Sequence, residues 1–183
     1  MDPCEMGRDL EKVLLTEEEI SQRLTEMAAE IDADYAGREI LLVGVLKGAA
    51  MVMADLSRKL AHDARMDWMA VSSYGSGTKS SGVVRIIKDL DTDLTGRDVL
   101  IVEDIVDSGL TLSWLAANLR SRGPASVEIA ALLRKPCEAK VQVNVKYCGF
   151  DIPGEFVVGY GLDYGERYRT LPFVGTLAPH VYA

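Results

Sequence analysis

Residues 99–111 read VLIVEDIVDSGLT, and this stretch decides the fold class. Its first four residues form a continuous apolar run, which is typical of a strand buried on both faces. After a small polar turn, residues 110–122 have the composition of a helix that ends before Gly123 and Pro124. A buried strand followed by a helix is the repeating unit of parallel sheets. The stretch therefore predicts an α/β fold with a largely parallel central sheet flanked by helices.

The same alternation continues on both sides of this stretch. Thr16 and Glu19 have the spacing of a capping box, so residues 16–35 are predicted to form a helix. An apolar run predicts a second buried strand at 40–45, and a helix is expected over 49–62. Further strands are expected at 68–72, 83–89, 127–133, 141–147, 156–160 and 174–177. The length of 183 residues, without repeats or low-complexity segments, favours a single domain over 1–183.

Composition excludes several classes of function. Acidic residues outnumber basic ones by 28 to 20, for a net charge of -8, whereas a general nucleic-acid binder needs a concentrated positive surface. No apolar run approaches the roughly 18 residues of a membrane span, and the first eight residues carry no secretory signal. Cys4, Cys137 and Cys148 lack metal-ligand spacing and are interpreted as free thiols in a reducing compartment. The chain is therefore predicted to be cytoplasmic, with neither nucleic acid nor membrane as a partner.

Two carboxylates, Glu103 and Asp104, directly follow the apolar run. Adjacent negative charges at a strand end are unfavourable unless something positive lies on them, and sugar hydroxyls bridged by a divalent cation would supply that. Asp107 then leads into the helix start, where backbone N–H groups and the helix dipole favour a phosphate. The residues of this turn are Ser108, Gly109, Leu110 and Thr111. The alternative is that Asp107 or Ser108 only caps the helix and that the two carboxylates are solvated.

The whole string between strand and helix resembles the 5-phosphoribosyl 1-pyrophosphate signature of type I phosphoribosyltransferases. Over roughly residues 10–180 the chain is similar to the bacterial hypoxanthine-guanine members of that family. The resemblance implies their fold, with a small hood formed by the chain termini and the C-terminal segment, about 150–183. It also implies Mg²⁺-dependent transfer of the 5-phosphoribosyl group to N9 of hypoxanthine or guanine, giving IMP or GMP and pyrophosphate. It further implies a homodimer or homotetramer, with Glu103 and Asp104 near the ribose and metal and Asp107 as the general base.

Two segments fit the leaving group and the exclusion of water. Lys47 and Gly48 follow the strand at 40–45, where a lysine and exposed N–H groups can hold an anion. The family uses this turn for pyrophosphate, and there the peptide before the lysine can be cis. Ser73 and Tyr74 open a glycine- and serine-rich loop, and the resemblance implies a lid over about 73–84 that keeps water from the reacting sugar. Without the resemblance, Lys47 would be an ordinary loop lysine and 74–82 a surface connection.

Other segments fit the purine and the metal. By resemblance, Lys135 lies against the purine O6; an ammonium group donates to O6 of hypoxanthine or guanine but cannot accept from the 6-amino group of adenine. Phe156 corresponds to the aromatic that stacks on the base, and backbone groups of Val157 read the base edge. Asp163 corresponds to a residue near the second metal and the purine 2-position, and Arg169 to a pyrophosphate contact. Composition alone would instead make Lys135 a surface residue, and Phe156 and Val157 core residues.

One departure and three alternatives accompany this interpretation. Leu110 stands where some relatives carry a polar or basic residue, which puts the phosphate affinity in doubt. Another base is possible: Lys135 and residues 156–163 disfavour adenine and pyrimidines but do not separate xanthine from hypoxanthine and guanine. A nucleotide-sensing regulator on the same fold is disfavoured by the acidic net charge and by the presence of Asp107. A receiver-like or dinucleotide-binding α/β protein is disfavoured because no G-x-G-x-x-G follows the first strand.

Overall fold

The main sheet of the protein is mixed but largely parallel. The computed structural model describes residues 9–73 and 84–182, and within them six strands lie in the order β4-β3-β2-β5-β6-β7. Their bounds are β2 Ile40–Leu46, β3 Arg65–Ser73, β4 Val84–Lys88, β5 Asp98–Val106, β6 Ser126–Arg134 and β7 Tyr147–Asp151. All neighbouring pairs are parallel except β3 and β4. The predicted α/β fold with a largely parallel sheet is confirmed.

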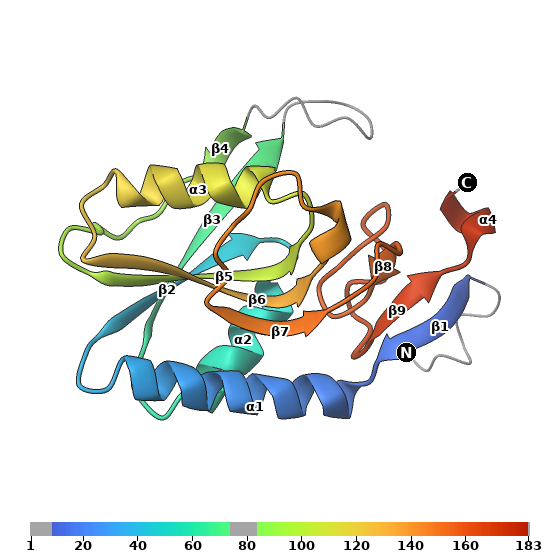
Figure 1. Ribbon diagram of the computed structural model, residues 1–183, viewed down its shortest axis with the longest axis horizontal. Coiled ribbons are helices and arrows are strands. Elements are labelled where there is room, and N and C mark those ends of the chain that lie inside the picture. The colour runs from blue at the N-terminus through green and yellow to red at the C-terminus, as the bar shows by residue number, and fades with distance from the viewer. Residues whose placement is uncertain (1–8, 74–83, 183) are drawn as a thin grey trace.

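Helices cover both faces of this sheet (Figure 1). α1 (Glu17–Asp34) and α2 (Ala50–Lys59) lie on one face, and α3 (Leu110–Arg120) lies on the other. Each face has its own apolar core: Leu24 and Leu56 belong to the first, and Leu112 and Leu115 to the second. The predicted capping box is present, because the Glu19 N–H donates to Thr16 Oγ1 at 3.2 Å and the Thr16 N–H donates to Glu19 Oε2 at 2.8 Å.

A second, three-stranded antiparallel sheet forms the hood beside the main sheet (Figure 1). Its order is β1-β9-β8, with bounds β1 Leu10–Leu15, β8 Val157–Val158 and β9 Val174–Leu177, so it joins the two ends of the chain. A short helix, α4 (Pro179–Tyr182), follows β9, and a 3₁₀ turn, η2 (Pro136–Glu138), follows β6. The expected hood of terminal and C-terminal segments is confirmed, while the single domain over 1–183 stays a prediction.

The predicted strand at 141–147 is wrong. Its alternation reflects packing, because Val143 and Val145 pack against the core beneath α3. The backbone of this segment turns instead to the loop before α3, where the N–H groups of Lys140 and Val141 donate to the Ser108 carbonyl at 3.0 and 3.2 Å. The strand that pairs with β6 on the side away from β5 is β7, which begins only at Tyr147.

The helix predicted over 49–62 ends earlier, at Lys59. Leu60 is extended, and the Ala61 N–H donates to the Asp32 carboxylate at 2.8 Å, which turns the chain away from the helix axis. Across the described ranges 9–73 and 84–182, no helix combines the length and apolarity that crossing a bilayer requires.

Candidate active site

The carboxyl ends of β2, β5 and β6 meet the hood at a pocket of about 420 Å³. β2 leads into α2 on one face and the neighbouring β5 leads into α3 on the other, so the chain changes face between them. Ligands of α/β proteins bind at such a switch point. The pocket lining includes these sequence-predicted residues: Lys47, Gly48, Glu103, Asp104, Asp107, Lys135, Phe156, Val157, Asp163 and Arg169.

Two adjacent carboxylates of β5 are withdrawn from water at this pocket. Glu103 is only 8% exposed, and burial, followed by the charge of Asp104, raises the pKa of Glu103 well above its usual value. Burial also raises the pKa of Asp104 to about 6, although the Ile105 N–H donates to Asp104 Oδ1 at 2.7 Å and favours the charged form. Glu103 is therefore not the solvated surface carboxylate of the alternative interpretation.

Two glycines bring separate backbone segments against this acidic pair. A Cβ on Gly48 would lie 1.7 Å from Asp104 Oδ2, and a Cβ on Gly161 would lie 2.0 Å from the Gly48 carbonyl oxygen. Gly161 also has a φ of +101°, which only glycine adopts readily. The peptide between Leu46 and Lys47 is cis. The loop after β2 is thus held between β5 and the hood.

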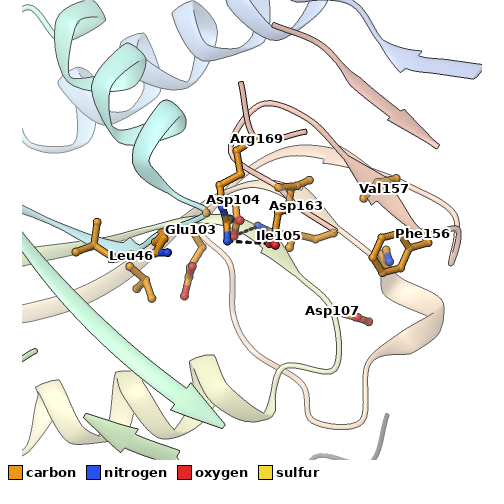
Figure 2. A pocket seen from close by; sticks show the side chains of 14 residues that line it. Leu46, Glu103, Asp104, Ile105, Asp107, Phe156, Val157, Asp163 and Arg169 are labelled. Atoms are coloured by element: carbon orange, nitrogen blue, oxygen red, sulfur yellow. Dashed lines mark hydrogen bonds and ion pairs between the residues drawn. The ribbon is translucent and has the colours of Figure 1, made fainter. Parts of the chain in front are cut away.

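Positive side chains converge beside the acidic pair. Arg169 Nη2 lies 2.9 Å from Asp163 Oδ1, and Arg169 Nη1 donates to the Gly161 carbonyl at 2.7 Å. Figure 2 shows Asp104, Asp163 and Arg169 gathered in one place, with Asp107 and Phe156 on the far side of the pocket. Lys47 Nζ lies 2.9 Å from Glu166 Oε2. This end of the pocket therefore suits a polyanion together with a cation.

The loop from β5 to α3 forms an adjoining pocket of about 230 Å³ lined by Asp107, Ser108, Gly109 and Thr111. Gly109 is the N-cap of α3, with a φ of +76° and no side chain to cap the helix. The capping alternative is therefore wrong for Asp107, while Ser108 Oγ accepts a long bond of 3.5 Å from the Leu110 N–H. A Cβ on Gly109 would also lie 2.5 Å from the Val141 carbonyl oxygen. Beyond that Leu110 bond, no side chain of the described residues accepts from the first-turn N–H groups of α3, which therefore suit an anion. Leu110 lies on that turn, outside the lining.

The main pocket is also lined by Lys135, Phe156 and Val157. Lys135 is 8% exposed, and among the described residues its ammonium group forms no ion pair. Phe156 is 39% exposed and packs edge to face against Tyr164, with ring centroids 5.7 Å apart. Val157 is buried in β8. The composition-based expectation is therefore confirmed for Val157 but wrong for Phe156 and Lys135.

Several residues of this site were not found from the sequence. Gly161 and Glu166 had no recognisable signal beyond a glycine-rich turn, because their partners are distant in the chain. Tyr164 lies in the segment that was singled out, but nothing indicated that its ring would pack against Phe156. Ser73 is the last residue of β3 and pairs with Val84. Tyr74 and most of the lid predicted at 73–84 lie outside the described residues.

Comparison with known proteins identifies the family. The model of the phosphoribosyl transferase domain matches residues 12–165. The hypoxanthine-guanine phosphoribosyltransferase of Mycobacterium tuberculosis is 56% identical over 180 residues, which cover 95% of this chain and 89% of that protein. The chain belongs to the hypoxanthine-guanine phosphoribosyltransferase family.

Other members of this phosphoribosyltransferase family agree in length and fold. The Bacillus subtilis hypoxanthine-guanine phosphoribosyltransferase is 52% identical over 177 residues, covering 97% of this chain and 98% of the relative. A crystal structure of a Staphylococcus aureus hypoxanthine phosphoribosyltransferase superposes with a TM-score of 0.95 at 48% identity, covering 100% of both chains. The match therefore extends over the hood as well as the main sheet.

Proposed function

We propose that the protein transfers the 5-phosphoribosyl group of 5-phosphoribosyl 1-pyrophosphate to N9 of hypoxanthine or guanine, forming IMP or GMP and pyrophosphate in purine salvage. The observation that carries the proposal is a pair of adjoining pockets whose linings share Glu103 and Asp107. The α3 loop, the acidic pair and the Lys135–Phe156 region line these pockets, and we assign to them the phosphate, the sugar and the base. Membership of the family supports the same substrates.

The ribose and a magnesium ion are assigned to Glu103 and Asp104, with Asp163 nearby. Two buried carboxylates with raised pKa values fit a divalent cation, because a positive charge restores their ionised forms. Among the described residues no cluster of three protein ligands could hold a metal ion by itself. This fits Mg²⁺, which keeps waters and substrate oxygens in its coordination shell. When bound, Mg²⁺ neutralises the developing charge of the leaving group.

The two phosphate-bearing ends of the substrate are assigned to opposite sides of the acidic pair. The 5′-phosphate fits the first turn of α3, whose N-cap is a glycine, with Ser108, Gly109, Leu110 and Thr111. Pyrophosphate is assigned to Lys47, Gly48 and Arg169, two cations and a glycine that line the main pocket. With these assignments C1′ would lie between Asp104 and the base region, which would align the substrates before reaction.

The purine is assigned to the space between Phe156 and Lys135. An exposed phenyl ring offers a stacking face, and the backbone of Val157 in β8 can read the base edge. The buried ammonium group of Lys135 has no carboxylate partner among the described residues, so a carbonyl oxygen such as O6 would satisfy it. Adenine presents a donor there and leaves the ammonium unsatisfied.

Asp107 is assigned as the general base. Its exposed carboxylate lines both the phosphate pocket and the main pocket, which Phe156 also lines. The N9–C1′ bond forms as the bond from C1′ to pyrophosphate breaks, and Asp107 accepts the proton that the purine releases at N7. Ser73 and Tyr74 are proposed to open a lid that keeps water from the reacting C1′. By analogy with the family, the working form is proposed to be a homodimer or homotetramer.

A base-panel assay tests this function. Purified protein is mixed with magnesium, 5-phosphoribosyl 1-pyrophosphate and one of hypoxanthine, guanine, xanthine or adenine, and nucleotide and pyrophosphate are quantified by chromatography. We expect IMP and GMP in amounts equal to the pyrophosphate released and no AMP. The absence of nucleotide with both hypoxanthine and guanine, or a comparable kcat/KM for adenine, would contradict the proposal.

A further inference from the structure

Glu166, a carboxylate that the proposed reaction does not use, lies behind two cations that line the pocket, Lys47 and Arg169. Its Oε2 lies 2.9 Å from Lys47 Nζ, and its Oε1 lies 3.1 Å from Arg169 Nη2. Both cations assigned to pyrophosphate are therefore paired with one protein carboxylate. The inference that follows rests on the proposed assignment of Lys47 and Arg169 to pyrophosphate.

The backbone at Glu166 is unusual for a glutamate. Tyr164 and Arg167 exchange two backbone hydrogen bonds of 3.2 and 3.1 Å, which closes a two-residue hairpin around Gly165 and Glu166. Both central residues have a positive φ, +57° for Gly165 and +65° for Glu166. Such a turn favours Gly, Asn or Asp at its centre, so a glutamate there is unfavourable for the backbone. An unfavourable residue at the edge of a binding pocket points to a role for its side chain.

The Glu166 side chain can also move away from Lys47 and Arg169 without disturbing the fold. The side chains of Lys47 and Glu166 are 67% and 63% exposed, and ion pairs between such exposed groups contribute little to folding stability. Arg169 is fixed independently, by its bond to the Gly161 carbonyl and its ion pair with Asp163. Glu166 can therefore turn into solvent while Arg169 stays in place for a ligand.

We propose that Glu166 is an internal counter-anion that sets the affinity of the site for pyrophosphate. Before substrate binds, Glu166 forms ion pairs with Lys47 and Arg169. The pyrophosphate group replaces Glu166 as their partner, and once the product forms Glu166 competes with pyrophosphate for both cations. Free pyrophosphate and the pyrophosphate of the sugar substrate meet the same competitor. Glu166 thus weakens substrate binding somewhat in exchange for faster product release.

The test compares pyrophosphate binding in matched carboxylate variants. Magnesium pyrophosphate is titrated calorimetrically into the wild type, Glu166→Gln and Glu39→Gln. Glu39 is a suitable control because its carboxylate also pairs with two cations, Arg65 at 2.9 Å and Arg97 at 2.8 Å. Glu39 lies just before the first residue of β2 and Lys47 just after the last, so the two residues are at opposite ends of the strand. We expect Glu166→Gln to lower the Kd and the product-inhibition constant of pyrophosphate by roughly three- to tenfold. Glu39→Gln should leave both constants unchanged.

A second variant guards against a folding artefact. Glu166→Gly removes the carboxylate and also suits the left-handed backbone, so it should show the same tightening. Equal or weaker pyrophosphate binding in both Glu166 variants would overturn the proposal, as would an equal tightening in Glu39→Gln. Failure of the proposed function has a different signature, because the wild type itself would then bind no pyrophosphate and form no nucleotide.

Discussion

Replacing Asp104 by asparagine should make the ligand-free protein more stable at neutral and alkaline pH. The pKa of Asp104 is about 6, against 3.8 for an ordinary aspartate, chiefly because burial penalises its charge. That difference corresponds to about 3 kcal/mol. Asparagine keeps the oxygen that accepts the Ile105 N–H but carries no charge. The gain from Asp104→Asn should therefore approach this value once the wild-type carboxylate is ionised.

The sign of the effect follows from where the proton is held. Between about pH 4 and 6 the unfolded wild-type chain has released this proton while the folded protein keeps it. The wild-type free energy of unfolding therefore falls as the pH rises through this window, and above it this group adds no further change. Asp104→Asn lacks that loss, so the two proteins should be equally stable near pH 4 and differ by about 3 kcal/mol at pH 8.

Urea unfolding followed by circular dichroism at pH 4, 6 and 8, without divalent metal, measures the difference. The same series with magnesium and 5-phosphoribosyl 1-pyrophosphate should reverse the order at pH 8, because the carboxylate is then neutralised by its ligand. A variant that is no more stable than the wild type at pH 8 would refute the reasoning. So would a difference that is as large at pH 4 as at pH 8.

Three further predictions concern the reaction and the hood. Asp107→Asn should lower kcat by roughly 10²–10⁴-fold in steady-state assays while the KM for 5-phosphoribosyl 1-pyrophosphate changes little, and a near-native kcat would remove Asp107 as the base. Lys135→Met should lower kcat/KM for hypoxanthine about a hundredfold, since a hydrogen bond from a charged donor is lost, and an unchanged value would place O6 elsewhere. Gly161→Ala should destabilise the protein by about 1–3 kcal/mol in urea unfolding, because the new Cβ meets the Gly48 carbonyl and φ is +101°. Gly37→Ala is its control: its φ is +74° but a Cβ there meets nothing within 4 Å, so an equal loss would show that backbone conformation alone is responsible.

Local patterns were sufficient for the central strands of the main sheet, though not for its edge strand β7, and for the centre of the pocket. β2 and residues 99–102 of β5 are buried on both faces, so their sequences are continuous apolar runs. The acidic pair and the turn before α3 lie in one stretch of chain, which is why their proximity could be predicted. The roles of individual residues came from family resemblance and not from these patterns.

Elements that depend on distant partners could not be predicted in this way. β1 has a largely exposed, weakly patterned sequence and forms a strand because β9 pairs with it from the other end of the chain. The segment at 141–147 shows the converse error, since its alternating valines pack under α3 while its backbone bonds to Ser108. The spacing of apolar residues along a segment indicates which side chains are buried. It does not indicate which other segment pairs with the backbone N–H and C=O groups of that segment.

The same limit explains why the pyrophosphate end of the pocket was incompletely predicted. Gly48 lies against Asp104 on one side and against Gly161 on the other, so three segments distant in sequence meet through backbone contacts. A sequence shows the glycines but not the partners for which they make room. Because Arg169 also bonds to the Gly161 carbonyl, any shift of the hood moves the arginine and the loop that carries Lys47 together. The hood is therefore part of the proposed pyrophosphate site. Changes at its glycine contacts should alter the KM for 5-phosphoribosyl 1-pyrophosphate more than the KM for the purine.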